Sequence, residues 1–478
     1  MSKEGYIKKD KRKKILLLCD DIRVHSGIAQ IGREIILESA HHYNWIQLAG
    51  AVKHPDKGKI IDLSATMEKE HGLEDASVVL FPQDGYGDSR ILRDIIKKEK
   101  PDALLLITDP RYFQFVFQIE NEIRKEIPII YLNIWDDYPA PQYNEEFYES
   151  CDALYGISKQ TVNINKIVLG DKAKDRVIEY LPHGLNDNIF KPRDKKEKII
   201  QEMEKNIFRG KEFDFKVLFN SRNIRRKQIS DTIWAFKMFL DSLPKEEADK
   251  CCLMMKTQPI DNNGTDLIAV CEYLFGDSWT DHVFFIDAHL NSEQMASLYN
   301  IADATVLLTS NEGWGLALTE SLLSGTPIIA NVTGGMQDQM RFIDENGKWF
   351  TPSPQVPSNN TRKYETHGEW AFPVFPACRS LQGSPITPYI WDDRCKPEDA
   401  AERMKEIYDL SPSERKSRGD KGREWAISEE AGFTSKHQGR RFIEYTEKLF
   451  NTWEPRERYE FLNSSEYKTR TSNHNLVY

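Results

Sequence analysis

Short apolar runs alternate with amphipathic stretches along most of the chain. Apolar runs of strand length occupy residues 14–20, 45–52, 102–108 and 128–136, and stretches such as 27–43 have the periodicity of a helix. Runs that are apolar at nearly every position are typical of parallel strands with helices on both faces, because neither face of such a strand meets water. The pattern therefore predicts a doubly wound α/β domain.

A charged stretch at residues 191–214 interrupts this alternation. The alternation then restarts, with strand-like runs that include 215–222, 304–310 and 326–332. One hydrophobic core seldom supports a chain of 478 residues, so a second domain agrees with the length as well. We expect two Rossmann-like domains that face each other across a cleft, followed by C-terminal helices.

The expected boundaries follow from the interruption. The N-terminal domain, on the acceptor side of the cleft, covers residues 1–195, and the C-terminal domain, on the donor side, covers 196–440. A last helix and tail, 441–478, return to the N-terminal domain. Residues 352–397 break the alternation with prolines and aromatic residues, and we interpret them as an ordered insertion. Ligands of such sheets bind beyond the carboxyl ends of the strands, so the cleft is the expected active site.

The composition narrows the class of protein. Hydrophobic residues make up 40% of the chain and charged residues 29%, as in ordinary globular proteins. We expect no membrane span and no signal peptide, because the apolar run near the N-terminus is too short. The seven cysteines are scattered and show no C-x-x-C spacing, which indicates a reducing, cytoplasmic location without structural zinc. A net charge of -10 argues against a surface that binds nucleic acid as a whole, although local basic clusters remain candidate contacts.

The stretch TSNEGWGLALTESLLSGTP, residues 309–327, carries the most informative chemistry. Glu312 follows a predicted strand, and Glu320 falls in the second turn of the helix that begins next. Gly313 and Gly315 allow a ligand to approach the backbone, and the helix start favours an anion such as phosphate. Glu320 could then accept hydrogen bonds from a sugar diol. Alternatively, Glu312 caps a helix and Glu320 is a surface residue.

Together with the following IIANVTGG, this stretch closely resembles the donor-site segment of glycosyltransferase family 4. The segment FNSRNIRRKQ is similar to the family's basic loop at the start of the donor domain, with Arg222 and Lys227 at the matching spacing and Ser221 and Gln228 in place of glycines. Two cations on one loop suit a diphosphate leaving group. We interpret Arg225 and Arg226, on the same loop, as a basic surface turn.

The resemblance covers roughly residues 14–350 and the C-terminal helices. RVHSGIAQIGREI is similar to the family's first loop, in which Gly27 admits the donor phosphates, and LPHGLNDNIFKP is similar to the end of its N-terminal domain. The family often has a histidine after a strand where this chain has Asp136 and Asp137. Either aspartate could take over its polar role toward the donor sugar, or another residue supplies it and the aspartates belong to a plain loop. We interpret His183 as structural.

This resemblance implies a GT-B fold and metal-independent transfer from a nucleotide-diphosphate sugar with retention at the anomeric carbon. It implies that Arg222 and Lys227 stabilise the leaving diphosphate, that Glu312 holds the donor sugar and that Glu320 binds the ribose. Asp136 and Asp137 complete the candidate catalytic set, as possible nucleophiles if a covalent intermediate forms; we favour transfer on one face without one. The remaining residues expected to bind the donor are Gly27, Gly313, Trp314, Gly315, Gly334 and Gly335.

The acceptor is less well defined. Several segments, including DPRYFQFVFQIENEIR and GSPITPYIWDDRC, resemble a subgroup found in large tailed bacteriophages, which suggests 5-hydroxymethylcytosine in DNA. The candidate acceptor contacts are Asp109, Arg111, Tyr112, Lys53, Arg90, Trp370 and Tyr389. A glycan, lipid or protein acceptor is the alternative. A hypothesis of another class is a catalytically silent protein that binds sugar nucleotides.

Overall fold

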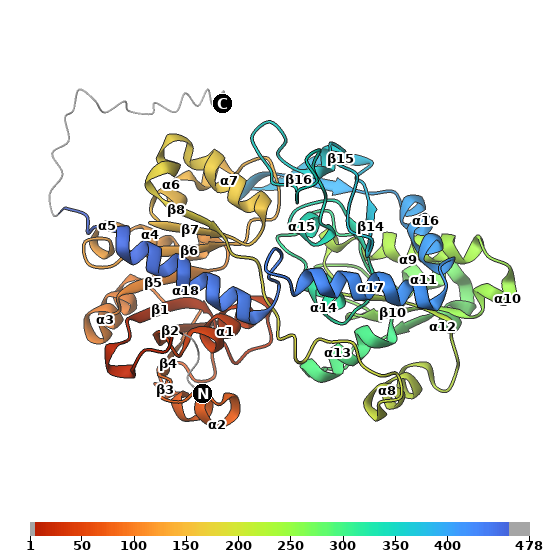
Figure 1. The fold of residues 1–478 in the computed structure, drawn as a ribbon, viewed down its shortest axis with the longest axis horizontal. Helices are drawn as coiled ribbons and strands as arrows, with labels where there is room; N and C mark the ends of the chain where they lie inside the picture. The colour runs from red at the N-terminus through yellow and green to blue at the C-terminus, as the bar shows by residue number, and fades with distance from the viewer. Residues whose placement is uncertain (1–4, 458–478) are drawn as a thin grey trace.

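The computed structural model of the protein describes residues 5–457, and two parallel β-sheets with flanking helices lie side by side in it (Figure 1). The first sheet has the strand order β3-β4-β2-β1-β5-β6-β7-β8. Its strands are β1 (Lys14–Asp20), β2 (Asn44–Ala51), β3 (Ile61–Asp62), β4 (Val78–Asp84), β5 (Ala103–Ile107), β6 (Ile129–Asn133), β7 (Ala153–Gly156) and β8 (Val177–Tyr180). All neighbours pair in parallel except β3 and β4. The chain order therefore reverses beside β1, as in a Rossmann fold.

Helices cover both faces of the first sheet. They are α1 (Gly27–Ser39), α2 (Ser64–His71), α3 (Ser89–Glu99), α4 (Gln114–Phe117), α5 (Glu120–Ile123), α6 (Glu145–Glu149) and α7 (Lys159–Leu169). Side chains of β1 alternate between two cores: Ile15 and Leu17 belong to one together with α1, and Leu16 and Leu18 to the other together with α3. This is why the strand is apolar at nearly every position.

The second sheet repeats the arrangement with the order β11-β10-β9-β12-β13-β14, entirely parallel. Its strands are β9 (Phe215–Asn220), β10 (Cys251–Lys256), β11 (Val283–Phe285), β12 (Ala304–Leu307), β13 (Ile328–Asn331) and β14 (Ala371–Val374). The edge strand β14 lies inside the segment that the sequence pattern treated as an insertion. Pro373 interrupts its pattern, and an edge strand tolerates the missing N–H.

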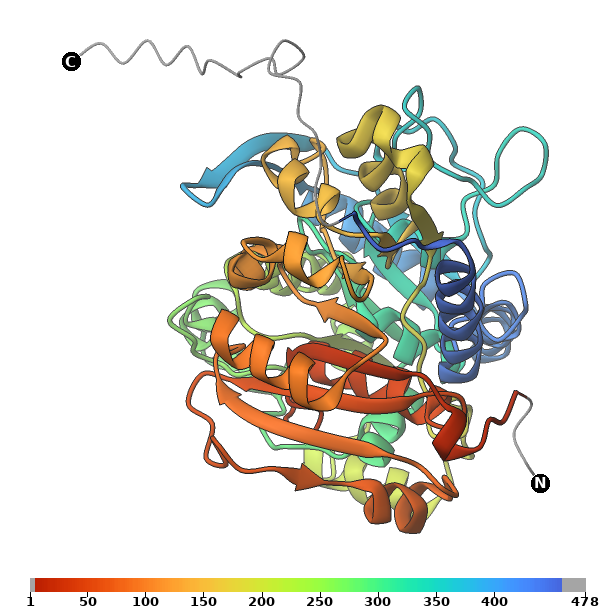
Figure 2. The same ribbon diagram turned by 90° about the vertical axis from the view of Figure 1, so that its left-hand side faces the viewer.

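The second sheet also has its own helices. They are α8 (Lys198–Phe208), α9 (Ile229–Asp241), α10 (Lys245–Ala248), α11 (Leu267–Phe275), α12 (Trp279–His282), α13 (Ser292–Ile301), α14 (Leu316–Leu323), α15 (Met336–Met340), α16 (Pro397–Tyr408) and α17 (Pro412–Ala426). Between β14 and α16 the chain forms an antiparallel hairpin outside both sheets, made of β15 (Cys378–Ser384) and β16 (Thr387–Arg394). Figure 2 shows this hairpin, in light blue, reaching toward the orange helices of the first unit.

The last helix, α18 (Ser435–Thr452), crosses back to the first sheet and packs along α1 (Figure 1). Its buried Phe442 contacts the rings of Tyr43, Trp45 and Tyr155. Burial of large aromatic rings is a strong source of packing energy, so this contact fastens the two units to each other. Residues 458–478, most of the expected tail, lie outside the described residues.

Candidate active site

A cavity of about 520 Å³ opens between the two sheets at the carboxyl ends of their strands. The first unit lines it with Gly27 and Ile31 of α1 and with residues that follow β6, β7 and β8. The second unit contributes the loop after β9, residues 220–227, and the loop and helix start after β12, residues 312–320. Both switch points of the strand order thus meet at one cavity, where an α/β protein normally binds its ligand.

Glu312 forms the charged centre of this cavity. It ion-pairs with Lys227 and with Arg226, whose Nη1 lies 3.2 Å from the Glu312 carboxylate. The side chains of Lys227 and Glu312 are largely buried, whereas that of Arg226 is 32% exposed. Burial alone would raise the pKa of Glu312, but the charges of Lys227 and Arg226 outweigh it and lower this pKa to about 2. Glu312 is therefore a carboxylate at any physiological pH.

The sequence prediction for the basic loop is wrong for Arg226. Arg225 is exposed, as expected of a surface turn, but the Arg226 side chain turns inward and also donates to the carbonyl oxygen of Asn311 at 2.6 Å. The carbonyl oxygen of Arg226 in turn accepts a hydrogen bond from the N–H of Ser310 at 2.8 Å. A run of three basic residues, 225–227, in the loop after a cleft-facing strand was the available signal.

Arg222 lies at the rim of the same cavity. Its side chain is 65% exposed and its Nε donates to Asp261 at 3.2 Å. The structure thus brings Arg222 and Lys227 to one cavity at different depths. An exposed arginine with one carboxylate partner can turn toward a second anion at little cost.

Glu320 lies at the far end of the cavity, on α14. Its Oε2 accepts hydrogen bonds from the hydroxyl of Tyr299 at 2.6 Å and from the side-chain amide of Asn220 at 3.3 Å. Burial raises the pKa of Glu320 to about 7, although these two hydrogen bonds lower it in part. Unlike Glu312, this carboxyl group titrates near neutrality.

The glycines of the two loops after β12 and β13 allow very close backbone contact. A Cβ on Gly335 would clash with the carbonyl oxygen of Gly313, and one on Gly334 would clash with the carbonyl oxygen of Glu312. A Cβ on Gly313 would lie 2.6 Å from the carbonyl oxygen of Ile134. Gly313 lines the cavity, whereas Gly334 and Gly335 support the Glu312 loop from behind.

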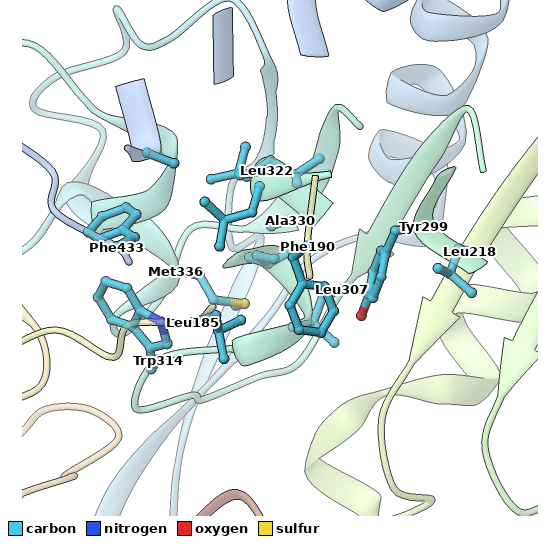
Figure 3. Packing of buried hydrophobic residues seen from close by; sticks show 14 of the residues in the cluster. Leu185, Phe190, Leu218, Tyr299, Leu307, Trp314, Leu322, Ala330, Met336 and Phe433 are labelled. Carbon is cyan, nitrogen blue, oxygen red and sulfur yellow. The ribbon is translucent and has the colours of Figure 1, made fainter. Parts of the chain in front are cut away.

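Trp314 and the neighbouring residues form an apolar wall of the cavity. Trp314 is buried, packs edge-on against Phe433 at a centroid distance of 5.0 Å, and donates from its indole N–H to Thr319 (Figure 3). Gly315, with φ 87°, precedes α14 in a left-handed conformation that glycine adopts without strain. His183 lies against Trp314, and burial lowers its pKa to about 3, so it is neutral.

The two candidate aspartates take different positions. Asp136 lines the cavity between Arg226 and the Glu312 loop, and burial raises its pKa while Arg226 opposes that shift. Asp137 is fully buried and does not reach the cavity; it accepts hydrogen bonds from Gln160 at 3.0 Å and from Thr333 at 3.1 Å. Burial and the nearby Asp393 raise the pKa of Asp137 well above its usual range.

A second cavity of about 470 Å³ adjoins the first. Ile134, Asp136 and Arg226 line both cavities, and the hairpin β15–β16 closes the second one from the outside. Asp109 and Arg111, two of the candidate acceptor contacts, lie in its wall. The sequence analysis placed this segment in an ordered insertion and named Tyr389 as a candidate contact, but it did not predict the hairpin, because the two strands pair only with each other and carry no strong apolar pattern.

The other candidate acceptor contacts lie apart from this wall. Tyr389 belongs to the hairpin and packs edge-on against Tyr143 at 4.8 Å. Tyr112, Lys53 and Arg90 are exposed and line neither cavity. The expectation for Trp370 is wrong: its ring is buried and stacked on Trp425 at 5.1 Å.

Residues 5–457 contain no group of three or more histidine, cysteine or acidic side chains arranged to hold a metal ion. No helix in this part of the chain is long and apolar enough to cross a membrane.

Comparisons with known proteins agree with this geometry. A family model described as glycosyl transferases group 1 matches residues 278–357, which include the Glu312 loop and α14. The structure is similar to that of Anabaena HepE in complex with UDP and glucose, with a TM-score of 0.62 and 13% identity over 91% of this chain and 100% of that one. It is also similar to sucrose-phosphate synthase from Thermosynechococcus elongatus, with a TM-score of 0.65 and 15% identity over 92% and 100% of the two chains. A comparison with curated protein sequences gives no match.

At these identities the structural likeness concerns the fold. The two Rossmann-like units that face each other across the cavity form the GT-B fold. The segment that matches the glycosyl transferases group 1 model lies in the second unit of this fold and contains the Glu312 loop.

Proposed function

We propose that the protein transfers a sugar from a nucleotide-diphosphate sugar to an acceptor hydroxyl, with retention at the anomeric carbon and without a metal. The observation that carries the proposal is the cluster of Glu312, Lys227 and Arg226 at the cavity centre. Solved proteins of the same fold support the choice of donor, because Anabaena HepE has been solved with UDP and with UDP-glucose.

The proposed division of roles follows from charge. Lys227 and Arg226 have Glu312 as counter-anion, and the diphosphate of a donor would bring further anionic oxygens to the same two cations. Charge builds up on the diphosphate as the glycosidic bond breaks, and buried cations stabilise it more strongly than exposed ones. Arg222 at the rim is the third cation of this proposed set. The N-terminus of α14 adds its partial positive charge.

In this proposal the carboxylates bind the uncharged sugar and ribose groups of the donor. Glu312, relieved of part of its contact with Lys227, would accept hydrogen bonds from the donor-sugar hydroxyls. Glu320, which lies 8 positions after Glu312 in the sequence, would accept hydrogen bonds from the ribose hydroxyls. Asp136, at the junction of the two cavities, is the candidate that lies nearest the reacting carbon, whereas the fully buried Asp137 would act on it only indirectly. We retain transfer on one face as the proposed route.

Two acceptor classes remain within the proposal. The sequence resemblance suggested 5-hydroxymethylcytosine in DNA, and Arg111 in the wall of the second cavity is the one basic candidate contact that supports it. A carbohydrate, lipid or protein hydroxyl is the alternative. We further propose that the protein acts in the cytoplasm, since all seven of its cysteines are free thiols.

Replacement of Lys227 tests the proposed function. With a panel of nucleotide-diphosphate sugars, we expect the unmodified protein to release nucleoside diphosphate and Lys227→Ala to lower the turnover by about 10²-fold or more, because a transition-state charge partner is lost. The matched control is Arg225→Ala, an exposed cation two positions away on the same loop, which should retain full turnover. Nucleotide release is measured by chromatography.

Two results would contradict the proposal. Turnover of Lys227→Ala within a few-fold of the unmodified protein would remove the role of this cation. Release of no nucleotide from any donor, combined with tight binding of UDP, would favour the catalytically silent sugar-nucleotide-binding protein instead.

A further inference from the structure

The hairpin β15–β16 stands outside both sheets, yet it touches both units of the molecule. On the second unit it is anchored by the N–H of Asp393, which donates to the carbonyl oxygen of Ser310 at 2.9 Å. On the first unit, the N–H of Trp391 donates to the carbonyl oxygen of Tyr138 at 2.7 Å. An element tied to both sides of a cleft fixes the width of the cleft at that point.

The tip of the hairpin is held by Arg111. Its Nη1 donates to the carbonyl oxygen of Ile386 at 2.5 Å and to the hydroxyl of Thr387. The hydroxyl of Tyr143 donates to the carbonyl oxygen of Tyr389 at 2.9 Å. These contacts join residues more than 200 positions apart, and they close the second cavity on the side away from the donor site.

The cavity behind the hairpin is electrically balanced. Four charged side chains line it, two acidic (Asp109, Asp136) and two basic (Arg111, Arg226). Arg111 is bound to Asp109, through Nε at 2.7 Å and through Nη2, and its remaining Nη1 holds the hairpin. Arg226 is bound to Glu312. The two carboxylates oppose the two cations, so this lining carries no net positive charge that would attract a phosphate or carboxylate.

The uncharged lining suits a polyol instead. Asn311, Gln382, Ser384 and Thr387 carry amide or hydroxyl groups that both donate and accept hydrogen bonds. Trp135, Ile134 and Ile390 provide apolar surface beside them. A sugar ring presents the same combination, with hydroxyls at its edge and C–H groups on its faces, and polar groups placed beside apolar surface are the usual means of orienting a small ligand.

We propose that the hairpin β15–β16 is the acceptor-selecting wall of the active site, and that the cavity it closes takes an uncharged saccharide unit whose hydroxyl receives the transferred sugar. The inference rests on the proposed transferase function and deepens it. Because Ile134, Asp136 and Arg226 border both cavities, an acceptor there lies next to the donor-sugar end of the first cavity. Gln382, an exposed residue of β15 that lines the cavity and whose side-chain amide donates to the hydroxyl of Ser380 at 3.0 Å, is the residue with which the hairpin itself contacts the acceptor.

Gln382 allows a sharp test, because its neighbour Leu381 is exposed and does not line the cavity. Using the donor that the unmodified protein hydrolyses, transfer to glucose, maltose, glucose 6-phosphate and a single-stranded oligonucleotide that contains 5-hydroxymethylcytosine is measured by mass spectrometry. We expect transfer to the neutral sugars. Gln382→Ala should raise the acceptor KM about 5-fold, as expected for one lost hydrogen bond, with an unchanged donor KM. Leu381→Ala, the matched control, should change neither constant.

A charge introduced at the same position tests the selecting role. Gln382→Lys should shift the ratio of kcat/KM for glucose 6-phosphate over glucose about 10-fold toward the phosphate, because it adds an unpaired cation to a balanced lining. A merely structural role of the hairpin would lower both values equally and leave the ratio unchanged, and that result would overturn the inference. Transfer to the oligonucleotide and to no neutral sugar would overturn the saccharide class. Hydrolysis of no donor by the unmodified protein would instead refute the transferase function itself.

Discussion

At the scale of single residues, the two glutamates of the 309–327 stretch show how strongly surroundings decide the chemistry of a side chain. Glu312 has two cations as partners, and its pKa is about 2. Glu320 has only neutral partners, Tyr299 and Asn220, and burial raises its pKa to about 7. Two carboxyl groups 8 positions apart thus differ in charge around neutral pH. Their spacing in the sequence carried no information on this difference.

The raised pKa of Glu320 gives a pH-dependent prediction. Below about pH 7 the group is protonated, and above it the carboxylate can accept hydrogen bonds from ribose hydroxyls. We therefore expect the affinity for UDP, measured by titration calorimetry, to rise about 10-fold between pH 6 and pH 8 as the carboxylate forms. Glu320→Gln should flatten this dependence. The titration of UDP itself is common to both proteins, so equal slopes would contradict a role of Glu320 in binding the nucleotide.

At the scale of elements, the loops that follow β9, β12 and β13 form one interlocked unit. The N–H of Gly335 donates to the carbonyl oxygen of Glu312 at 3.0 Å, and the carbonyl oxygen of Arg226 accepts from the Ser310 N–H. The strands themselves were predictable from local apolar patterns. The locking of their loops was not, since it depends on backbone atoms that approach each other only after the sheet has formed.

Because these loops are interlocked, we expect one added methyl group at Gly335 to lower both the stability and the activity of the protein. Gly335→Ala places a Cβ against the carbonyl oxygen of Gly313, so the loop that carries Glu312 must shift. We expect the free energy of unfolding to fall by about 1–3 kcal/mol, as for an overpacked site, and kcat/KM to fall at least about 10-fold. Denaturant unfolding and donor kinetics measure the two effects.

The control for this variant is Gly347→Asn. Gly347 has φ 73°, a conformation that asparagine tolerates, and open space around it. Unchanged donor kinetics in Gly335→Ala would show that the loop accommodates the methyl group without moving Glu312.

At the scale of the whole molecule, a buried pair of carboxyl groups joins the two units. Asp137 of the first unit and Asp393 of the hairpin both lie 3.1 Å from the hydroxyl of Thr333. That hydroxyl has one proton to donate, and Arg379, 2.6 Å from Asp393, is the cation bound to the pair. Two buried carboxylates with one cation repel each other, and burial together with the nearby Asp393 raises the pKa of Asp137 well above its usual range.

A difference in pKa between the folded and unfolded states makes the stability of the protein depend on pH. A carboxyl group whose pKa is higher in the folded than in the unfolded state contributes stability that is present at acidic pH and lost as the pH rises through the folded-state pKa. We expect the Tm of Asp137→Asn to decline less between pH 6 and pH 9 than that of the unmodified protein, because the amide cannot ionise. Thermal unfolding across this range is the measurement. Asp249→Asn, at an exposed helical ion pair, is the control, and parallel curves for Asp137→Asn and the unmodified protein would contradict the raised pKa of Asp137.

Local patterns in the sequence predicted the two doubly wound units and the loops at the carboxyl ends of their strands. They could do so because strand and helix patterns are local, and because parallel sheets always present their carboxyl-end loops to the ligand. Tertiary structure alone decided that Arg226 faces inward, that Asp137 is hidden and that a hairpin far along the chain closes the second cavity. Arg226 and Glu312 are 86 positions apart, and Arg111 and Thr387 are 276 apart. Burial and ion pairing between such residues depend on which segments come together in space, and no local pattern records that.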